Sequence, residues 1–195
     1  MFGFERIGDL IWAAGDTRAR GFLVGGTSGR TTLAGEGLQH QDGHSHILAL
    51  ANPSVWAYDP AYACEIAVIV REGLRRILAE GEDVVYYVTV MNEFYPMPAM
   101  PEGVEEGILK GIYKLRASEN KRAKIKAHLL ASGTIVNEAV AAQGLLEQDF
   151  GVAADVWSVT SFKSLYWDAI AAERRNLRRP QQDPQPSFLQ RQLAG

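Results

Sequence analysis

A cluster of proton-exchanging and carboxylate side chains lies in GEGLQHQDGHSH, residues 35–46. It holds three of the four histidines of the chain, His40, His44 and His46, together with Glu36 and Asp42. Histidine changes its charge near neutral pH, so it can exchange protons or meet an anion under ordinary conditions. These residue types at this density indicate a site for acid–base catalysis or for anion binding.

Three other interpretations of this stretch have to be weighed. His40, Asp42, His44 and His46 are metal-ligand types, but their spacing matches no known zinc motif and the glycines leave the loop poorly preorganised, so no metal is expected. A phosphate loop is disfavoured because GTSGRT (26–31) has the wrong spacing and an arginine in place of the lysine. A polar surface loop with incidental histidines is the simplest alternative, and only the density of histidines argues against it.

The elements that must position this stretch are of mixed helix and strand type. Apolar spacing predicts a helix over 4–20 and a stronger one over 59–81, with Asp59 as its cap and Gly81 at its end. The run GFLVGG (21–26) and the β-branched and aromatic run DVVYYVTVM (83–91) predict buried strands.

The connections in this half are long. Residues 27–46 form a glycine-rich polar connection, and a stretch of that length inside a compact domain is usually functional or disordered. Prolines make 47–60 irregular and punctuate the loop 92–103, which a short helix over 104–115 follows.

The second half begins after a charged connection, RASENKRAK (116–124). A strand over 124–133, a helix over 134–151 and a strand over 152–162 predict a βαβ unit, whose two strands must be parallel. A further helix is possible over 163–175, and the proline- and glutamine-rich residues 181–195 predict a disordered tail. Each half offers too few strands for a complete α/β domain, so we expect pieces of two such domains.

Composition excludes several classes of protein. The net charge of −3 and the lack of aromatics among the basic runs 120–124 and 173–179 predict no nucleic-acid binding. No apolar run reaches the roughly 20 residues of a membrane span, and no signal pattern is visible. The single cysteine, Cys64, excludes an internal disulfide framework. We therefore expect a cytoplasmic location.

Four segments carry a resemblance to a known family. FGFERIGDLIWAAGD (2–16), the stretch 19–46 that includes the histidines, MNEFYPMPAMPEG (91–103) and EEGILKGIYKL (105–115) closely resemble the homodimeric bacterial type of pyruvate dehydrogenase E1 component, a thiamine-diphosphate-dependent, transketolase-like family. The resemblance runs to about Pro180. It implies that 1–116 form the second half of the pyrimidine-binding middle domain, that 117–180 form the first half of a transketolase C-terminal-like domain, and that 181–195 are unrelated to the family.

The resemblance also implies roles for five residues. Phe2 matches the aromatic residue that packs on the aminopyrimidine ring of the cofactor, and Arg6 an arginine that pairs with carboxylates near that ring. His40 matches the active-site histidine that faces the reacting carbon, and His46 the histidine of a substrate-contacting motif. Glu36 matches a loop residue that links the active centres of a dimer. A core aromatic and a helix-surface arginine are the structural alternatives for Phe2 and Arg6.

The implied activity is oxidative decarboxylation of pyruvate with transfer of the acetyl group to the lipoyl group of the E2 partner. The implied cofactor is thiamine diphosphate with Mg²⁺, and a second E1 subunit is the homodimer partner. The chain departs from the family pattern, because neither the GDG…N motif that holds Mg²⁺ and diphosphate nor the ring-activating glutamate has a counterpart here. We therefore expect this chain to be inactive alone. A non-catalytic assembly fragment and a transketolase-type enzyme acting on sugar phosphates are the alternatives.

Overall fold

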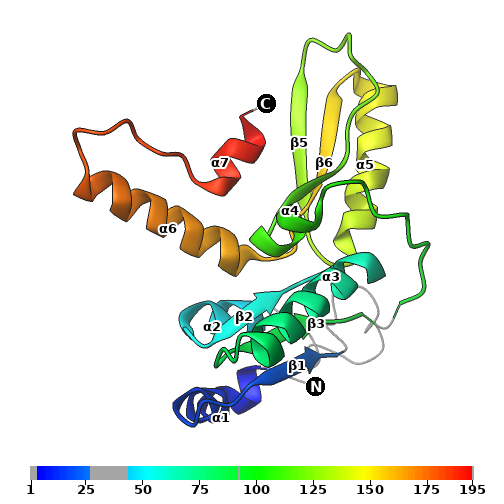
Figure 1. Ribbon diagram of the computed structural model, residues 1–195. Helices are drawn as coiled ribbons and strands as arrows, with labels where there is room; N and C mark the ends of the chain where they lie inside the picture. The colour runs from blue at the N-terminus through cyan, green and yellow to red at the C-terminus, as the bar shows by residue number, and fades with distance from the viewer. Residues whose placement is uncertain (1–3, 27–43, 92, 195) are drawn as a thin grey trace.

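The computed structural model describes residues 4–26, 44–91 and 93–194, which form two small three-stranded sheets with helices around them (Figure 1). The first half contains α1 (Phe4–Asp16), β1 (Gly21–Gly25), α2 (Ser45–Ala51), β2 (Val55–Tyr58), α3 (Ala63–Leu74), a π-helical turn (Arg75–Ala79), β3 (Val85–Thr89) and α4 (Glu105–Lys110). The second half contains β4 (Tyr113–Arg116), β5 (Lys126–Ala131), α5 (Ile135–Phe150), β6 (Ala153–Ser158), α6 (Phe162–Arg178) and α7 (Phe188–Leu193). The predicted α/β class is confirmed.

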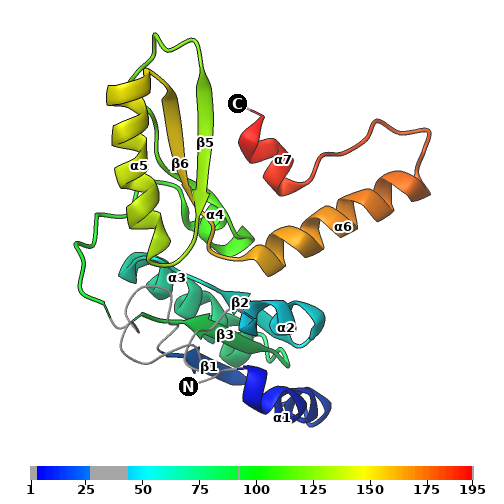
Figure 2. The ribbon, with the colours of Figure 1, turned by 180° about the vertical axis from the view of Figure 1, so that it is seen from behind.

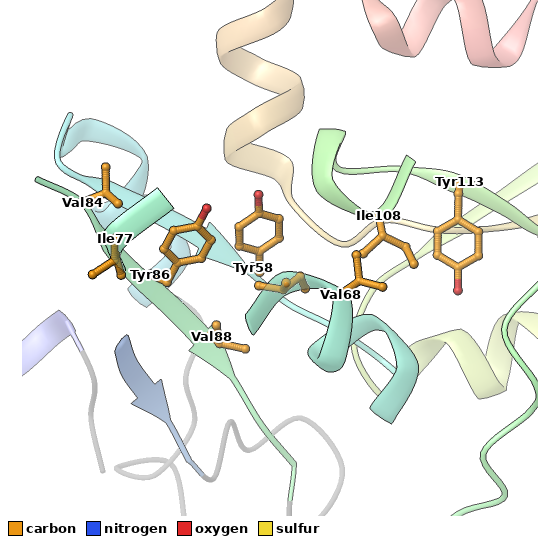
Figure 3. Close-up of a cluster of buried hydrophobic side chains, with 9 residues drawn as sticks. Tyr58, Val68, Ile77, Val84, Tyr86, Val88, Ile108 and Tyr113 are labelled. Atoms are coloured by element: carbon orange, nitrogen blue, oxygen red, sulfur yellow. The ribbon is translucent and has the colours of Figure 1, made fainter. Parts of the chain in front are cut away.

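The first sheet is parallel, with β3 between β1 and β2. All five residues of β3 are buried, as expected of a parallel strand that is covered on both faces. On one face Tyr86 stacks on Tyr58 with ring centroids 5.8 Å apart, in the cluster drawn in Figure 3. On the other face Tyr87 meets the ring of Phe4 edge-on at 4.9 Å. The sheet therefore has two apolar layers, one against α3 and one against α1 and α2.

Two elements lie in the stretch that the prolines predict to be irregular. Helix α2 and strand β2 occupy 45–51 and 55–58, and Pro53 lies in the short gap between them. Ala49 of α2 is fully buried against the same layer as Phe4 and Tyr87. The prediction that 47–60 are irregular was therefore wrong. A helix of seven residues depends on tertiary packing more than on its own propensity, and local sequence does not show that packing.

The predicted helix over 104–115 ends earlier than expected. α4 stops at Lys110 because Gly111 adopts φ +106°, a left-handed conformation that favours glycine. A Cβ at Gly111 would lie 2.4 Å from the carbonyl oxygen of Ser161, so no other residue fits this turn. The chain then reverses into β4, which pairs antiparallel with β6.

The second sheet has the order β4-β6-β5. Strands β5 and β6 are parallel and α5 connects them, so the predicted βαβ unit is confirmed. The helix predicted over 163–175 is also present, as α6.

The start of α3 differs from the prediction. Asp59 does not cap this helix, which begins at Ala63 with Tyr62 at the cap position. The side chain of Glu65 turns back to accept hydrogen bonds from the backbone N–H groups of Ala61 and Tyr62. The other end agrees with the prediction, since Gly81 has φ +70° and follows the π-helical turn.

Glu65 also joins the two halves of the chain. Its side chain is fully buried, and its second oxygen accepts a hydrogen bond from the Tyr113 hydroxyl at 2.8 Å and from Ser158 Oγ at 2.6 Å. Burial and the neighbouring Glu65 charge raise the pKa of Tyr113, so this phenol stays protonated and donates. One carboxylate thus accepts four hydrogen bonds, two from the segment before α3, one from β4 and one from β6.

Backbone hydrogen bonds tie the halves together close to the first sheet. Asp59, one residue after β2, donates its N–H to the carbonyl of Thr160 at 2.7 Å. Its carbonyl oxygen accepts from the N–H of Gly133 at 3.1 Å. Ser161 Oγ donates to the carbonyl of Ala57 at 2.7 Å. The carboxyl end of β2 is therefore held by residues on both sides of α5 and β6.

Lys163 is a buried cation in the same junction. Its ammonium donates to the carbonyl oxygens of Ala49 and Asn52, at the end of α2, and its side chain is 8% exposed. Burial lowers its pKa from the ordinary value to about 8. Between this pKa and that of an exposed lysine, the unfolded chain binds more protons than the folded one, so stability rises with pH.

We expect the free energy of unfolding of the native chain, measured relative to Lys163→Met, to rise by about 2 kcal/mol from pH 8 to pH 10. Urea denaturation of both proteins at several pH values in this window measures it. Lys110→Met is the control, because Lys110 is exposed and paired with Glu106, and the difference should stay flat. A flat difference for Lys163→Met as well would contradict the burial argument.

Residues 188–193 form α7, where the sequence predicts a disordered tail. Ser187 and Gln190 build a capping box at its start, and Asp168 of α6 accepts a hydrogen bond from the N–H of Phe188. Phe188 is buried against Ile112 and the second sheet. Local composition missed these contacts because they depend on residues far away in the sequence.

Helix α6 leads away from both sheets in the two opposite views of Figures 1 and 2, and the chain returns from its end to α7. Asn176 fixes the return, since its side chain bonds both the N–H and the carbonyl of Gln185. Neither α6 nor any other helix in the described ranges has the length and apolar character to span a membrane.

Candidate functional site

The carboxyl ends of β2 and β3 meet the start of α2. Thr89 is the last residue of β3, Asp59 directly follows β2, and His46 lies in the first turn of α2. In open parallel sheets, ligands bind outside the carboxyl ends of the strands, where loops bring polar side chains together. This edge is therefore the part of the first sheet where chemistry is expected.

The three side chains form a continuous hydrogen-bonded array. His46 Nε2 lies 3.2 Å from Thr89 Oγ1, and Thr89 Oγ1 donates to Asp59 Oδ1 at 2.6 Å. The imidazole nitrogen is 4.0 Å from the same carboxylate oxygen. Thr89 and Asp59 are buried, whereas 22% of the His46 side chain is exposed. In this array the carboxylate and the hydroxyl are buried, and the imidazole is the group that reaches solvent.

The distances favour one arrangement of protons. A hydroxyl carries one proton, and the short contact to Asp59 indicates that Thr89 donates it to the carboxylate, the stronger of its two acceptors. Thr89 Oγ1 is then the acceptor for a proton on His46 Nε2. In this tautomer Nδ1 is the basic nitrogen of the ring. Buried partners that fix a ring and its tautomer are the arrangement that proton transfer requires.

Aromatic rings form the apolar side of this edge. The ring of Tyr87 lies 5.3 Å from that of His46 and packs on Phe4 behind it. Gly25 ends β1 beside Tyr87, and a Cβ there would lie 2.6 Å from the tyrosine hydroxyl oxygen. Only glycine allows β1 and the Tyr87 ring to approach so closely.

The start of α1 reaches the same region. Glu5 Oε1 lies 3.4 Å from Nδ1 of His44, the residue that precedes α2. Arg6, which the family resemblance assigns to the cofactor site, is exposed on the same turn of α1. The structure thus places Arg6 on a turn that adjoins the start of the His46 helix.

Three predicted site residues, Phe2, Glu36 and His40, lie outside the described residues. Of the predicted set, the structure therefore locates Arg6 and His46. Two residues that it adds, Asp59 and Thr89, were not recognised from the sequence as site residues. Thr89 offered a signal, because it is the one polar side chain besides the two tyrosines within the run VVYYVTV and lies toward its carboxyl end.

Among the described residues, no group of three or more His, Cys, Asp or Glu side chains is gathered closely enough to hold a metal ion. The donor set at this edge is an imidazole, a hydroxyl and a buried carboxylate. It fits hydrogen bonding to a carbonyl or carboxylate and the movement of one proton.

Comparison with protein families decides the relationship of this chain. Residues 1–98 match the family described as pyruvate dehydrogenase E1 component middle domain, and residues 111–189 match the transketolase-like C-terminal domain. The chain belongs to the pyruvate dehydrogenase E1 family. The predicted resemblance and the fold class, a transketolase-like middle-domain part followed by a C-terminal-like βαβ part, are confirmed.

Curated relatives give the same assignment. The chain is 57% identical over 195 residues to the pyruvate dehydrogenase E1 component of Pseudomonas aeruginosa, covering 100% of this chain and 22% of the relative. It is 56% identical over 190 residues to that of Escherichia coli K12, covering 97% of this chain and 21% of the relative. The chain thus spans about a fifth of the length of these relatives. Residues after Pro180 align as well, so the expectation that they are unrelated to the family was wrong.

Solved structures agree at the level of the fold. A transketolase from Campylobacter jejuni superposes with a TM-score of 0.63 at 19% identity, covering 90% of this chain and 26% of that structure. One from Leishmania mexicana gives 0.63 at 16%, with 90% and 24% covered. At these identities the similarity establishes the fold alone. The family matches therefore favour the E1 assignment over a transketolase-type enzyme.

Proposed function

We propose that this chain supplies part of the active centre of a pyruvate dehydrogenase E1 component, which decarboxylates pyruvate oxidatively and transfers the acetyl group to a lipoyl-bearing E2 partner. The observation that carries the proposal is the array of His46, Thr89 and Asp59 at the carboxyl edge of the first sheet. Its partly buried imidazole has the partners that a proton-handling or carboxylate-binding group needs.

Within this proposal His46 contacts the substrate. In the imidazolium form its Nδ1–H donates to the carboxylate or the keto oxygen of pyruvate, or gives its proton to the keto oxygen, and in the neutral form Nδ1 accepts that proton. Thr89 holds the orientation of the ring, and Asp59 holds that of Thr89. Thr89 and Asp59 are both buried, so water is kept away from the hydroxyl and the carboxylate. This strengthens the hydrogen bond between His46 and Thr89 and that between Thr89 and Asp59.

The cofactor in this proposal is thiamine diphosphate, which supplies the carbanion chemistry that the side chains of the protein lack. Phe2 and Arg6 are the proposed contacts to its aminopyrimidine ring, and His40 and Glu36 line the same centre. The sequence has no GDG…N motif, and the donor set at this edge does not resemble a site for Mg²⁺ and diphosphate, so we assign neither group to the described residues.

The proposed domain division is 1–116 for the second half of the middle domain and 117–180 for the first half of the C-terminal-like domain. The hydrogen bonds of β4 with β6 connect the end of the first part to the second sheet. A second E1 subunit is the proposed homodimer partner, and the proposed location is the cytoplasm.

A segment exchange tests the proposal. The matching segment of the Pseudomonas aeruginosa relative is replaced by this chain, and release of CO₂ from carboxyl-labelled pyruvate is measured with thiamine diphosphate, Mg²⁺ and ferricyanide as electron acceptor. We expect the chimera to keep kcat within about tenfold of the parent, because one or two misplaced side chains would cost roughly 10²-fold. The chain by itself should release no CO₂.

A chimera that has the parent's oligomeric state and thermal stability but decarboxylates pyruvate more than about 10²-fold more slowly contradicts the proposal. Circular dichroism and size-exclusion chromatography of both proteins distinguish this result from misfolding.

A further inference from the structure

One face of α6, together with the residue that follows the helix, gathers four arginines beside a tryptophan. The residues recur every three or four positions, the spacing that places side chains on one side of a helix. We call them the arginine face: Trp167, Ile170, Ala171, Arg174, Arg175, Arg178 and Arg179. Together they line a groove of 330 Å³.

The opposite face of α6 is already occupied. Ala172 is buried and Asn176 bonds Gln185 in the returning chain, while Glu173 points to that side. The arginine face lines a different groove from Ala172, Glu173 and Asn176. Both lie along α6, the helix that leads away from both sheets (Figure 2).

The four guanidinium groups have no carboxylate partners among the described residues. Other cations in residues 4–26, 44–91 and 93–194 do form ion pairs with acidic side chains, namely Arg18, Arg20, Arg75, Arg76, Lys110 and Lys114. Arg175 Nε is enclosed and lacks a hydrogen-bond partner in the same part of the chain. The negative end of the helix dipole tolerates cations in the last turn, yet it satisfies none of these N–H donors.

Trp167 gives the groove an apolar end. Its indole N–H is engaged by the carbonyl oxygen of Leu50 at 3.3 Å, and its ring is 41% exposed. The ring is therefore held in place with part of its surface open to a ligand. Tryptophan and arginine side chains are enriched at the surfaces by which proteins bind one another, and here both types lie side by side.

We propose that the arginine face binds an acidic polypeptide segment in extended conformation. From Trp167 to Arg178, its last residue, the helix rises about 16 Å, which is the length of about five extended residues. Carboxylates spaced along such a segment pair with the guanidinium groups, and an apolar residue at one end covers Trp167.

Charge favours a short acidic peptide over a nucleic acid. Removing the four arginines from the net charge of −3 leaves −7 for the rest of the chain. A long polyanion that extends beyond the groove therefore meets repulsion, whereas a segment of the length of the groove does not. The inference is independent of the activity proposed for the strand edge.

Fluorescence anisotropy tests the proposal with the complete chain and a labelled peptide of six glutamates and one leucine. We expect saturable binding at low ionic strength that weakens at least tenfold in Arg174→Gln/Arg178→Gln/Arg179→Gln. The charge-matched control is Lys121→Gln/Arg122→Gln/Lys124→Gln, which removes three exposed cations from the other basic run and should change the Kd less than twofold.

A triple replacement of the same arginines by lysine separates charge from folding, and it should retain binding within threefold to fivefold. Equal weakening by both glutamine triples overturns the proposal, because the peptide would then follow net charge alone. Absence of saturable peptide binding also overturns it, as does tighter binding of an oligothymidylate with six phosphates.

Discussion

Replacing Glu65 with alanine is expected to lower the free energy of unfolding by about 3–5 kcal/mol, the range for breaking a buried charged network by removing one member. The carboxylate is fully buried and accepts four hydrogen bonds. Its removal leaves the hydroxyls of Tyr113 and Ser158 and two backbone N–H groups without that acceptor. Urea denaturation followed by circular dichroism measures the change.

Glu72→Ala is the matched control on the same helix. Glu72 pairs with Arg75 three residues later at the surface, and such pairs contribute well under 1 kcal/mol. Glu65→Gln should fall between the two, because the amide keeps one acceptor oxygen and the hydroxyls of Tyr113 and Ser158 can rotate to accept from its NH₂ group. A loss below about 1 kcal/mol for Glu65→Ala would show that the junction does not depend on this carboxylate.

Replacing His46 with glutamine in the chimera is expected to lower kcat by about 10²–10⁴-fold, the usual contribution of a positioned acid–base group. Glutamine approximates the size of imidazole and can still bond Thr89, but it cannot exchange a proton. Steady-state rates of pyruvate decarboxylation measure the effect, and thermal unfolding shows whether the fold is kept.

Two further substitutions test the role of Thr89 and provide a control for His46→Gln. Thr89→Val keeps the shape of the side chain and removes the hydroxyl between His46 and Asp59, so we expect a smaller loss, up to about 10²-fold, from a misplaced ring. His128→Gln is the control, because His128 lies on β5 and is engaged by the indole N–H of Trp157. If His46→Gln changes kcat less than about threefold while the fold is intact, His46 has no catalytic role.

The local sequence pattern was sufficient to predict an element where that element carries a complete apolar periodicity or a long β-branched run of its own. The βαβ unit of the second half was recognised because α5 and its flanking strands each carry a complete signal. The buried run of β3 was equally clear. β2 and β4 were missed, because each is a strand of four residues whose order comes from pairing with β3 or β6.

The site was predictable only in part for the same reason. The histidines were recognised as candidate site residues from their type and spacing, and the family resemblance assigned a role to His46. Asp59 was read as a helix cap, since an aspartate before a proline and an apolar run fits that role. Its position beside Thr89, thirty residues later in the sequence, follows from the register of two parallel strands, which local reasoning does not supply.

Asp59 is held by both halves of the molecule at once. Its side chain belongs to the first sheet, while its backbone is bonded to Thr160 and Gly133 of the second half. Two domains joined by a linker normally drift relative to one another. Here such movement would displace the carboxylate of Asp59 and, through Thr89, change the orientation of the His46 ring. The alignment of His46 therefore depends on both halves of the molecule. A substitution in β6 or α5 that shifts Thr160 or Gly133 would alter this alignment although it contacts none of the three side chains.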